Sequence, residues 1–233
     1  LLQRIAKVLD WGFAQGHCAT EAPLRSVRVG LSTKLKRPEH FKSLPHAEVG
    51  ALMTKLAEND TAGRLALRFL VLTAGRSGEV RGATWDEVDL PNAVWTIPDS
   101  RMKARRQHRV PLSAAAVSVL ETAAKLRKGI AREPIFPGMK HQSLSDATMT
   151  KVLRTEIGGR WTIHGFRSSF RVWAAENGYQ HEAAEAALAH TIPNKVVAAY
   201  LRTDFLDQRR PMMAAWAAYI LPPSPTKRTS ARS

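Results

Sequence analysis

One apolar segment constrains the fold of this chain more than any other. Residues 61–73 carry large apolar side chains on nearly every side of a helical projection, namely Leu65, Leu67, Phe69, Leu70, Val71 and Leu72. A helix that is hydrophobic all round lies inside a protein rather than on its surface. We therefore predict a buried central helix at residues 61–73. A chain of 233 residues buries roughly 70% of its unfolded surface, so this core needs no disulfide or metal.

The segments that flank this helix carry the spacing of amphipathic helices. Val49, Leu52, Met53 and Leu56 recur at i, i+3, i+4 and i+7, which is one face of a helix. A second such face begins at Phe166. Further helices are predicted at residues 1–16, 77–82, 113–126, 145–157, 165–176, 181–188, 194–200 and 204–221.

One stretch has β-strand character. Residues 93–98 contain Val94, Trp95, Thr96 and Ile97, which are good strand formers, and residues 107–112 follow after a polar loop. The two segments predict a hairpin with a basic tip, paired with a third strand near residues 84–88. The fold class is therefore mainly α with a small antiparallel β-sheet (α+β).

The chain divides into four parts by composition. Residues 1–16 are predicted to be the last helix of a truncated preceding domain, and residues 17–42 a basic linker without clear periodicity. Residues 43–221 form the main domain, and residues 222–233 a disordered basic tail. The chain does not begin with Met, so we expect it to be a piece of a longer protein.

Composition narrows the function. There are 35 Lys and Arg against 20 Asp and Glu, a net charge of +15, which favours a polyanionic partner and most simply nucleic acid. The single cysteine, Cys18, excludes an intrachain disulfide framework and a zinc finger, and a reducing cytoplasm is expected. The longest apolar run, 212–221, is shorter than the roughly 18 residues of a membrane span, so no membrane partner is expected.

Two polar motifs precede the middle of the chain. Arg76 follows the buried helix after Gly75, and Glu79 comes three residues later. Considered without the other motifs, Arg76 and Glu79 are more simply interpreted as a surface ion pair. The second motif is the hairpin loop, where five of the nine residues 101–109 are Lys or Arg. Such charge density repels itself, and a phosphate backbone would relieve the repulsion.

Two more motifs lie in the C-terminal half. His164 and Arg167 form a His-x-x-Arg spacing, which chance alone produces readily in a chain with 8 histidines. His190 ends a Leu-Ala-His triplet and Tyr200 follows ten residues later. Taken singly, a histidine at a helix start is more often a cap, and a lone tyrosine is more often half-buried packing.

The order of these motifs resembles the catalytic domain of the tyrosine recombinases, the phage integrase family. The resemblance covers about residues 41–221. Several segments are similar to integrases of genomic islands and satellite prophages, namely residues 81–89, 102–113 and 194–200, with Gln208, Arg209, Arg210, Met213 and Trp216. The resemblance implies the tyrosine recombinase catalytic-domain fold, with residues 1–16 as the end of a core-binding domain.

The resemblance also assigns roles. Arg76 and Arg167 would clamp the phosphodiester through bidentate guanidinium contacts, and His190 would donate to the same oxygens. Tyr200 would be the nucleophile and His164 its base or proton acceptor. Lys103 would be the general acid that protonates the leaving 5′-hydroxyl. Glu79 would orient Arg76 or a neighbouring side chain. The predicted DNA contacts are Arg101, Arg105, Arg106 and Arg109.

The implied activity is that of a site-specific recombinase acting through a 3′-phosphotyrosyl link, with no metal and no cofactor. Its partners would be double-stranded DNA attachment sites and an accessory directionality factor. The chain would be a monomer when free and would form a homo-tetramer on DNA. The expected location is the cytoplasm of a bacterium, with the gene carried by the bacterium or a phage.

Two alternatives share part of this pattern. A type IB topoisomerase-like DNA relaxase uses the same chemistry but works alone, whereas recombinases generally dock a C-terminal segment on a neighbour. A non-catalytic DNA-binding module would be favoured if Tyr200 or Arg167 were missing, and neither is. An RNA-binding protein is disfavoured because no aromatic RNP-like strand is present.

Overall fold

The computed structural model describes residues 2–30, 42–130, 132–190 and 204–221. The chain divides into two compact units, residues 1–40 and residues 41–233, which we call the N-terminal unit and the main unit. The helix predicted at 194–200, Tyr200 within it, and the predicted tail at 222–233 lie outside the described residues.

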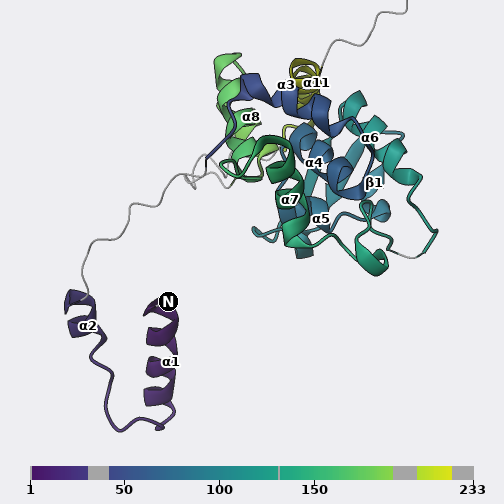
Figure 1. Ribbon diagram of the computed structural model, residues 1–233. Coiled ribbons are helices and arrows are strands. Elements are labelled where there is room, and N and C mark those ends of the chain that lie inside the picture. The colour runs from purple at the N-terminus through teal and green to yellow at the C-terminus, as the bar shows by residue number, and fades with distance from the viewer. Residues whose placement is uncertain (1, 31–41, 131, 191–203, 222–233) are drawn as a thin grey trace, which may run out of the picture. The chain divides into compact units, whose positions relative to one another are not determined.

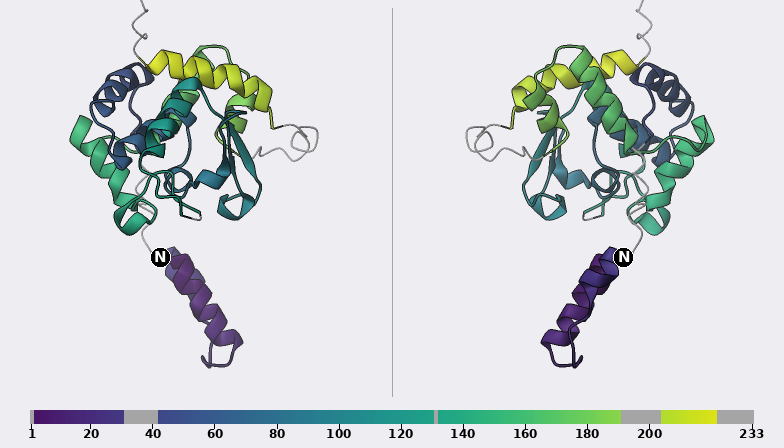
Figure 2. Two further views of the ribbon diagram at one scale, coloured as in Figure 1. Left: turned by 90° about the vertical axis from the view of Figure 1, so that its right-hand side faces the viewer. Right: turned by 90° about the vertical axis from the view of Figure 1, so that its left-hand side faces the viewer.

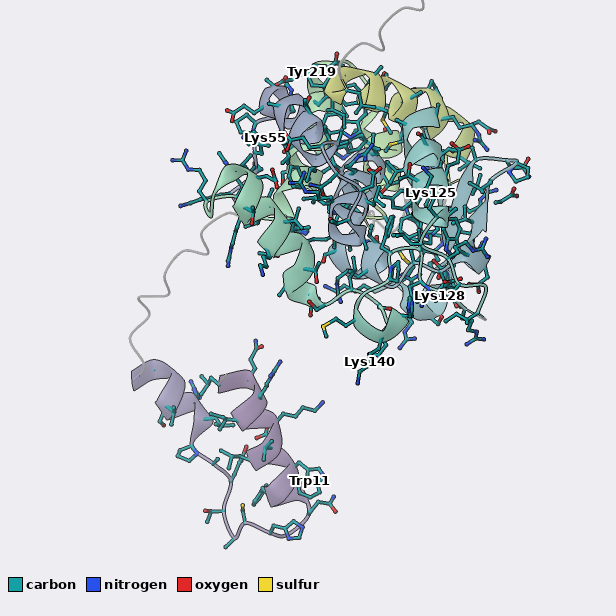
Figure 3. The ribbon with its side chains drawn as sticks, turned by 45° about the vertical axis from the view of Figure 1, so that its right-hand side comes forward. Trp11, Lys55, Lys125, Lys128, Lys140 and Tyr219 are labelled. Atoms are coloured by element: carbon teal, nitrogen blue, oxygen red, sulfur yellow. The ribbon has the colours of Figure 1, made fainter. Side chains whose placement is uncertain are left out.

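The N-terminal unit contains α1 (Leu2–Ala14), as predicted, and α2 (Leu24–Gly30). In α1, Val8 and Trp11 are exposed, and Trp11 is labelled in Figure 3. The second helix lies in the segment predicted as a basic linker without clear periodicity. It begins directly after Pro23, a residue that favours the first turn of a helix, and the Pro23 carbonyl accepts a hydrogen bond from Val27 N at 3.1 Å.

The predicted central helix is confirmed as α4 (Ala62–Thr73). Its first turn is capped by Thr61, whose side chain accepts from Arg64 N, and residues on all its faces are buried. The helices that pack around it include α3 (His46–Leu56), α6 (Ala114–Ala124) and α7 (Asp146–Ile157), as Figure 1 shows. The apolar face predicted from Val49 to Leu56 points into this core.

The β-sheet has three antiparallel strands in the order β1-β2-β3, which are Val88–Asp89, Val94–Ile97 and His108–Pro111. Trp95 pairs with Val88 on one side and with Val110 on the other. The predicted hairpin is confirmed, but the third strand is shorter than predicted. Residues Trp85–Glu87 form a 3-10 turn, because Thr84 pairs with Pro134 instead of β2. Figure 2 shows the sheet and α7 at opposite sides of the main unit.

The remaining helices are α5 (Ser77–Arg81), α8 (Gly165–Glu176), α9 (His181–Ala187) and α11 (Leu206–Ile220). The apolar face of α11 is buried against its own chain, with contacts to α3, α4, α9 and β3. A polar group ties three helices together, because His46 lies 2.8 Å from both Tyr219 Oη and Glu176 Oε2. Tyr219 is labelled in Figure 3. None of the described helices is long and apolar enough to cross a membrane.

Candidate active site

Arg76 is held at the junction between α4 and α5. The preceding residue but one, Ala74, ends α4 in a left-handed conformation with φ of 50°, which turns the chain sharply. Arg76 NH1 donates to Glu79 Oε1 at 2.7 Å, and its backbone N–H donates to the other carboxylate oxygen at 3.0 Å. The predicted orienting contact between Glu79 and Arg76 is therefore present in the structure, with Glu79 buried and Arg76 partly exposed.

Arg167 lies on the first turn of α8 and is almost completely buried. Gly165, two residues before Arg167, is required by close packing. A Cβ at this position would lie 2.7 Å from the Ser43 Cα, so only glycine leaves room for the chain at residues 42–43. The Arg167 guanidinium donates to the Ala74 carbonyl at 2.7 Å and to the Leu188 carbonyl at 2.5 Å. Its buried Nε has no partner among the described residues.

Two carbonyls after α9 gather the guanidinium groups. Arg76 NH2 donates to the Leu188 carbonyl at 3.1 Å and to the Ala189 carbonyl at 3.0 Å, and Arg167 shares the Leu188 carbonyl. His190 Nε2 lies 3.0 Å from Arg167 NH2. Three predicted residues from distant parts of the sequence, Arg76, Arg167 and His190, therefore meet at one place.

A residue that the sequence did not single out supports His190. Glu185 Oε2 lies 2.8 Å from His190 Nδ1, and Glu185 Oε1 accepts from Arg171 Nε at 2.6 Å. Although burial opposes it, the hydrogen bonds from Arg171 and His190 hold the pKa of Glu185 below its usual value. Glu185 comes five residues before His190, a spacing that gives no helical-face signal.

The cluster is strongly positive. Burial, and then the charge of Arg76, lower the pKa of Arg167 to about 10, so its guanidinium stays charged at neutral pH. Partial burial, and then the charges of Arg167 and Arg76, lower the pKa of His164. His164 is therefore neutral near pH 7 and able to accept a proton.

The basic hairpin loop presents its charges unequally. Met102 is buried and anchors the turn, whereas Lys103, Arg105 and Arg106 are exposed. Within the described residues, no hydrogen bond or ion pair joins Lys103 to the arginine–histidine cluster. Its placement beside a reacting phosphate stays a prediction.

Two of the predicted DNA contacts have acidic partners inside the chain. Arg101 is ion-paired with Glu87 and donates to the Glu79 carbonyl. Arg109 Nε donates to Asp204 Oδ2 at 2.8 Å. Arg105 and Arg106 are therefore the better placed of the four for a phosphate backbone.

His108 on β3 is a second residue that sequence reasoning passed over. Burial, and then the charge of Arg209, lower its pKa to about 4, with a smaller contribution from Arg76. Arg209 on α11 is fully buried, and Asp204 at 3.6 Å is its ion-pair partner. The sequence signal that could have pointed to His108 was its position beside the basic loop, at the start of the predicted second strand of the hairpin.

The described residues contain no group of three His, Cys, Asp or Glu side chains that could hold a metal ion. The donors of the cluster are guanidinium and imidazole groups. A cationic pocket of this kind suits an anion such as a phosphodiester.

Comparison with known proteins gives a consistent result. The model of the phage integrase family matches residues 42–206. The prophage integrase IntA of Escherichia coli (strain K12) is 36% identical over 225 residues, covering 94% of this chain and 53% of that protein. The integrase of Enterobacteria phage P4 is 31% identical, covering 94% of this chain and 54% of that protein. The chain therefore spans about half the length of these curated relatives.

Solved structures share the fold. A lambda integrase dimer bound to a COC′ core site has a TM-score of 0.57 at 20% identity, over 82% of this chain and 70% of that one. The XerA recombinase has a TM-score of 0.54 at 18% identity, over 80% of this chain and 71% of that one. The predicted fold is thereby confirmed.

Proposed function

The chain belongs to the phage integrase family, and from that premise we propose that it is the catalytic part of a site-specific DNA recombinase. It would cut and rejoin duplex DNA through a 3′-phosphotyrosyl intermediate, and so integrate or excise a mobile element. The observation that carries this proposal is the meeting of Arg76 and Arg167 at the Leu188 carbonyl, with His190 in contact with Arg167.

The chemistry follows from the charge of the transition state. Attack on a phosphodiester spreads negative charge over the non-bridging oxygens, and fixed cationic donors stabilise it. Arg76 is partly exposed and pre-oriented by Glu79, so its free N–H groups can meet these oxygens. Arg167 would supply its Nε, a buried donor that has no partner among the described residues. Arg167 is held by neutral carbonyls, which leave its charge available to the phosphate. Arg76 is held by two carbonyls and by the carboxylate of Glu79.

The proposed proton transfers balance. The Tyr200 phenol oxygen bonds to phosphorus while its proton passes to neutral His164, and the bond from phosphorus to the 5′-oxygen breaks. Lys103 gives a proton to that oxygen, which leaves as a hydroxyl. The phosphotyrosyl bond stores the energy of the broken one, so religation is the same sequence reversed.

The proposed partners are double-stranded attachment sites and further copies of the chain. A lambda integrase tetramer bound to a Holliday junction is among the solved structures of this fold, which supports a homo-tetramer on DNA. The free chain would be a monomer. An accessory directionality factor, and a role within the bacterial cytoplasm, complete the proposal.

The test is covalent trapping. The purified chain is incubated with a pool of nicked duplexes of randomised sequence, and adducts are resolved under denaturing conditions. Wild-type protein should give a denaturant-resistant adduct, and Tyr200→Phe should give none while still binding DNA, because only the phenolic oxygen is lost. Tyr219→Phe, at an exposed tyrosine on α11, is the matched control: it loses the hydroxyl that contacts His46 but should still form the adduct.

Two results would contradict the proposal. An adduct from Tyr200→Phe would exclude Tyr200 as the nucleophile. The lack of an adduct from the wild-type chain, with DNA binding intact, would exclude cleavage by this part of the protein.

A further inference from the structure

The side chains around His190 form a continuous polar chain. Arg171 Nε donates to Glu185 at 2.6 Å, Glu185 meets His190 Nδ1 at 2.8 Å, and His190 Nε2 meets Arg167 NH2 at 3.0 Å. Arg171 NH2 also lies 2.5 Å from His181 Nδ1. Glu185 is thus fixed from one side by a guanidinium and touches the imidazole from the other.

The hydrogen bonds assign the proton on His190. A guanidinium has donors and no acceptor, so Arg167 NH2 donates and His190 Nε2 accepts. A neutral imidazole that accepts at Nε2 carries its proton on Nδ1. That proton points at the Glu185 carboxylate, which is an acceptor only. The free site therefore holds His190 as the Nδ1–H tautomer.

This arrangement is the wrong one for the role proposed for His190. To bind a phosphate oxygen, Nε2 has to donate, and in the free site it accepts. Rotation of the ring does not solve this, because it would turn Nδ1–H away from the Glu185 carboxylate. The remaining route is a second proton, which makes the imidazole a donor at both nitrogens.

We propose that Glu185 is a positioning residue for His190, which holds the ring and stabilises the imidazolium that forms when a phosphodiester enters the site. One proton is taken up from solvent at Nε2, which then donates to a phosphate oxygen, and Arg167 NH2 turns from Nε2 to the phosphate. Nδ1–H keeps its bond to Glu185 throughout. This inference rests on the proposed function.

The charges around His190 explain why a carboxylate is needed there. Arg167 contacts the imidazole from the first turn of α8, and Arg76 bonds to the carbonyl of the adjacent Ala189 from the α4–α5 junction. Each guanidinium disfavours a further positive charge nearby, whereas His164 at the start of α8 is neutral. Glu79 is already hydrogen-bonded to Arg76. Among the described residues, Glu185 is the acid in contact with the imidazole. An acid on Nδ1–H both fixes the tautomer of a histidine and stabilises its charged form.

Nitrogen-15 NMR of histidine-labelled protein tests the proposal directly, with His190→Asn used to assign the signals. Wild-type His190 should show the Nδ1–H tautomer in the free chain and a doubly protonated ring in complex with the nicked duplex. A neutral ring in the complex, or an Nε2–H tautomer in the free protein, would overturn the inference without any variant being needed.

Glu185→Gln separates charge from hydrogen bonding, because its amide oxygen still accepts from Nδ1–H. Adduct formation should slow about 10- to 100-fold, the ring should stay neutral in the complex, and DNA affinity should be unchanged. Glu182→Gln, at an exposed glutamate on the same helix, is the matched control and should match wild type. Equal rates of adduct formation in Glu185→Gln and Glu182→Gln would contradict the positioning role of Glu185.

These failures are distinguishable from failure of the proposed function. Tyr200→Phe that still forms an adduct, or His190→Asn that cleaves at the wild-type rate, contradicts the site itself. Normal cleavage by Glu185→Gln with both of those variants inactive contradicts only the positioning role.

Discussion

At the scale of single residues, the two guanidiniums of the site are held mainly by carbonyls. Arg167 donates to the carbonyls of Ala74 and Leu188, and Arg76 donates to those of Leu188 and Ala189. A carbonyl orients a guanidinium without neutralising it, whereas Glu79 both orients Arg76 and offsets part of its charge. Arg167 is therefore pre-positioned by neutral groups, which is what a developing phosphate charge requires.

The identities of these residues were predictable, but part of their environment was not. The order of Arg76, His164, Arg167 and His190 in the sequence predicted a shared site, and the structure brings Arg76, Arg167 and His190 together. Glu185 was missed because it meets His190 only where the chain leaves α9. There Ala189 has a φ of 47° and His190 N donates to the Glu185 carbonyl, a turn that no periodicity encodes.

His108 makes stability depend on pH. Its pKa falls from 6.5 to about 4, because of burial first and then the charge of Arg209. Between these values the unfolded chain binds a proton that the folded chain does not, so stability falls as pH drops from 6.5 to 4. The loss from this group alone is about 3 kcal/mol, from ~1.36 kcal/mol for each pH unit.

The measurement is denaturant unfolding of the main unit at several pH values. His108→Gln keeps a donor but has no titration, so its unfolding free energy should fall less than that of wild type over this range. His17→Gln, at an exposed histidine of the N-terminal unit, should leave the pH dependence unchanged. Parallel curves for wild type and His108→Gln would show that His108 is not held neutral.

At the scale of elements, the helices followed from their apolar periodicity, and α8 begins and ends at the predicted residues. The length of the third strand did not follow from local sequence, because it depends on partners that are distant in the sequence. Thr84 pairs with Pro134 and Glu87 accepts from Trp95 Nε1 at 2.9 Å, contacts that local propensity cannot show. In the same way, Pro23 favours a linker when the sequence is considered alone, yet α2 begins directly after it in the structure.

The β2–β3 hairpin is the element expected to deliver the general acid. Buried Met102 anchors the turn and exposed Lys103 follows it. A 5′-alkoxide leaves poorly without a proton, whereas a thiolate is stable near neutral pH. Lys103→Ala should therefore slow cleavage of ordinary DNA strongly, by about 100-fold, and recover most of the rate when sulfur replaces the bridging 5′-oxygen.

Arg105→Ala is the matched control for this prediction, because it removes a charge from the same exposed turn. It should not be rescued by sulfur. Single-turnover cleavage rates on the two substrates provide the measurement. Equal impairment of Lys103→Ala on both substrates would leave Lys103 with an electrostatic role only.

At the scale of the whole molecule, positive charge is spread well beyond the candidate site. The net charge of +15 includes exposed lysines such as Lys125, Lys128 and Lys140, which Figure 3 labels on the main unit. Net charge alone therefore draws the chain to DNA without saying which surface meets it. A test of the hairpin has to separate a local interaction from the overall charge.

Salt dependence makes that separation. Binding to a phosphate releases condensed counterions, so the slope of log affinity against log salt concentration falls by about 0.9 for each duplex phosphate that the protein no longer neutralises. Arg105→Ala with Arg106→Ala should therefore flatten the slope by about two, because both side chains are exposed at the hairpin tip. Lys125→Ala with Lys128→Ala changes the net charge equally near the end of α6 and should leave the slope unchanged. Binding of a labelled duplex over a salt series measures both, and equal flattening by the two double variants would show that the hairpin tip has no phosphate partner of its own.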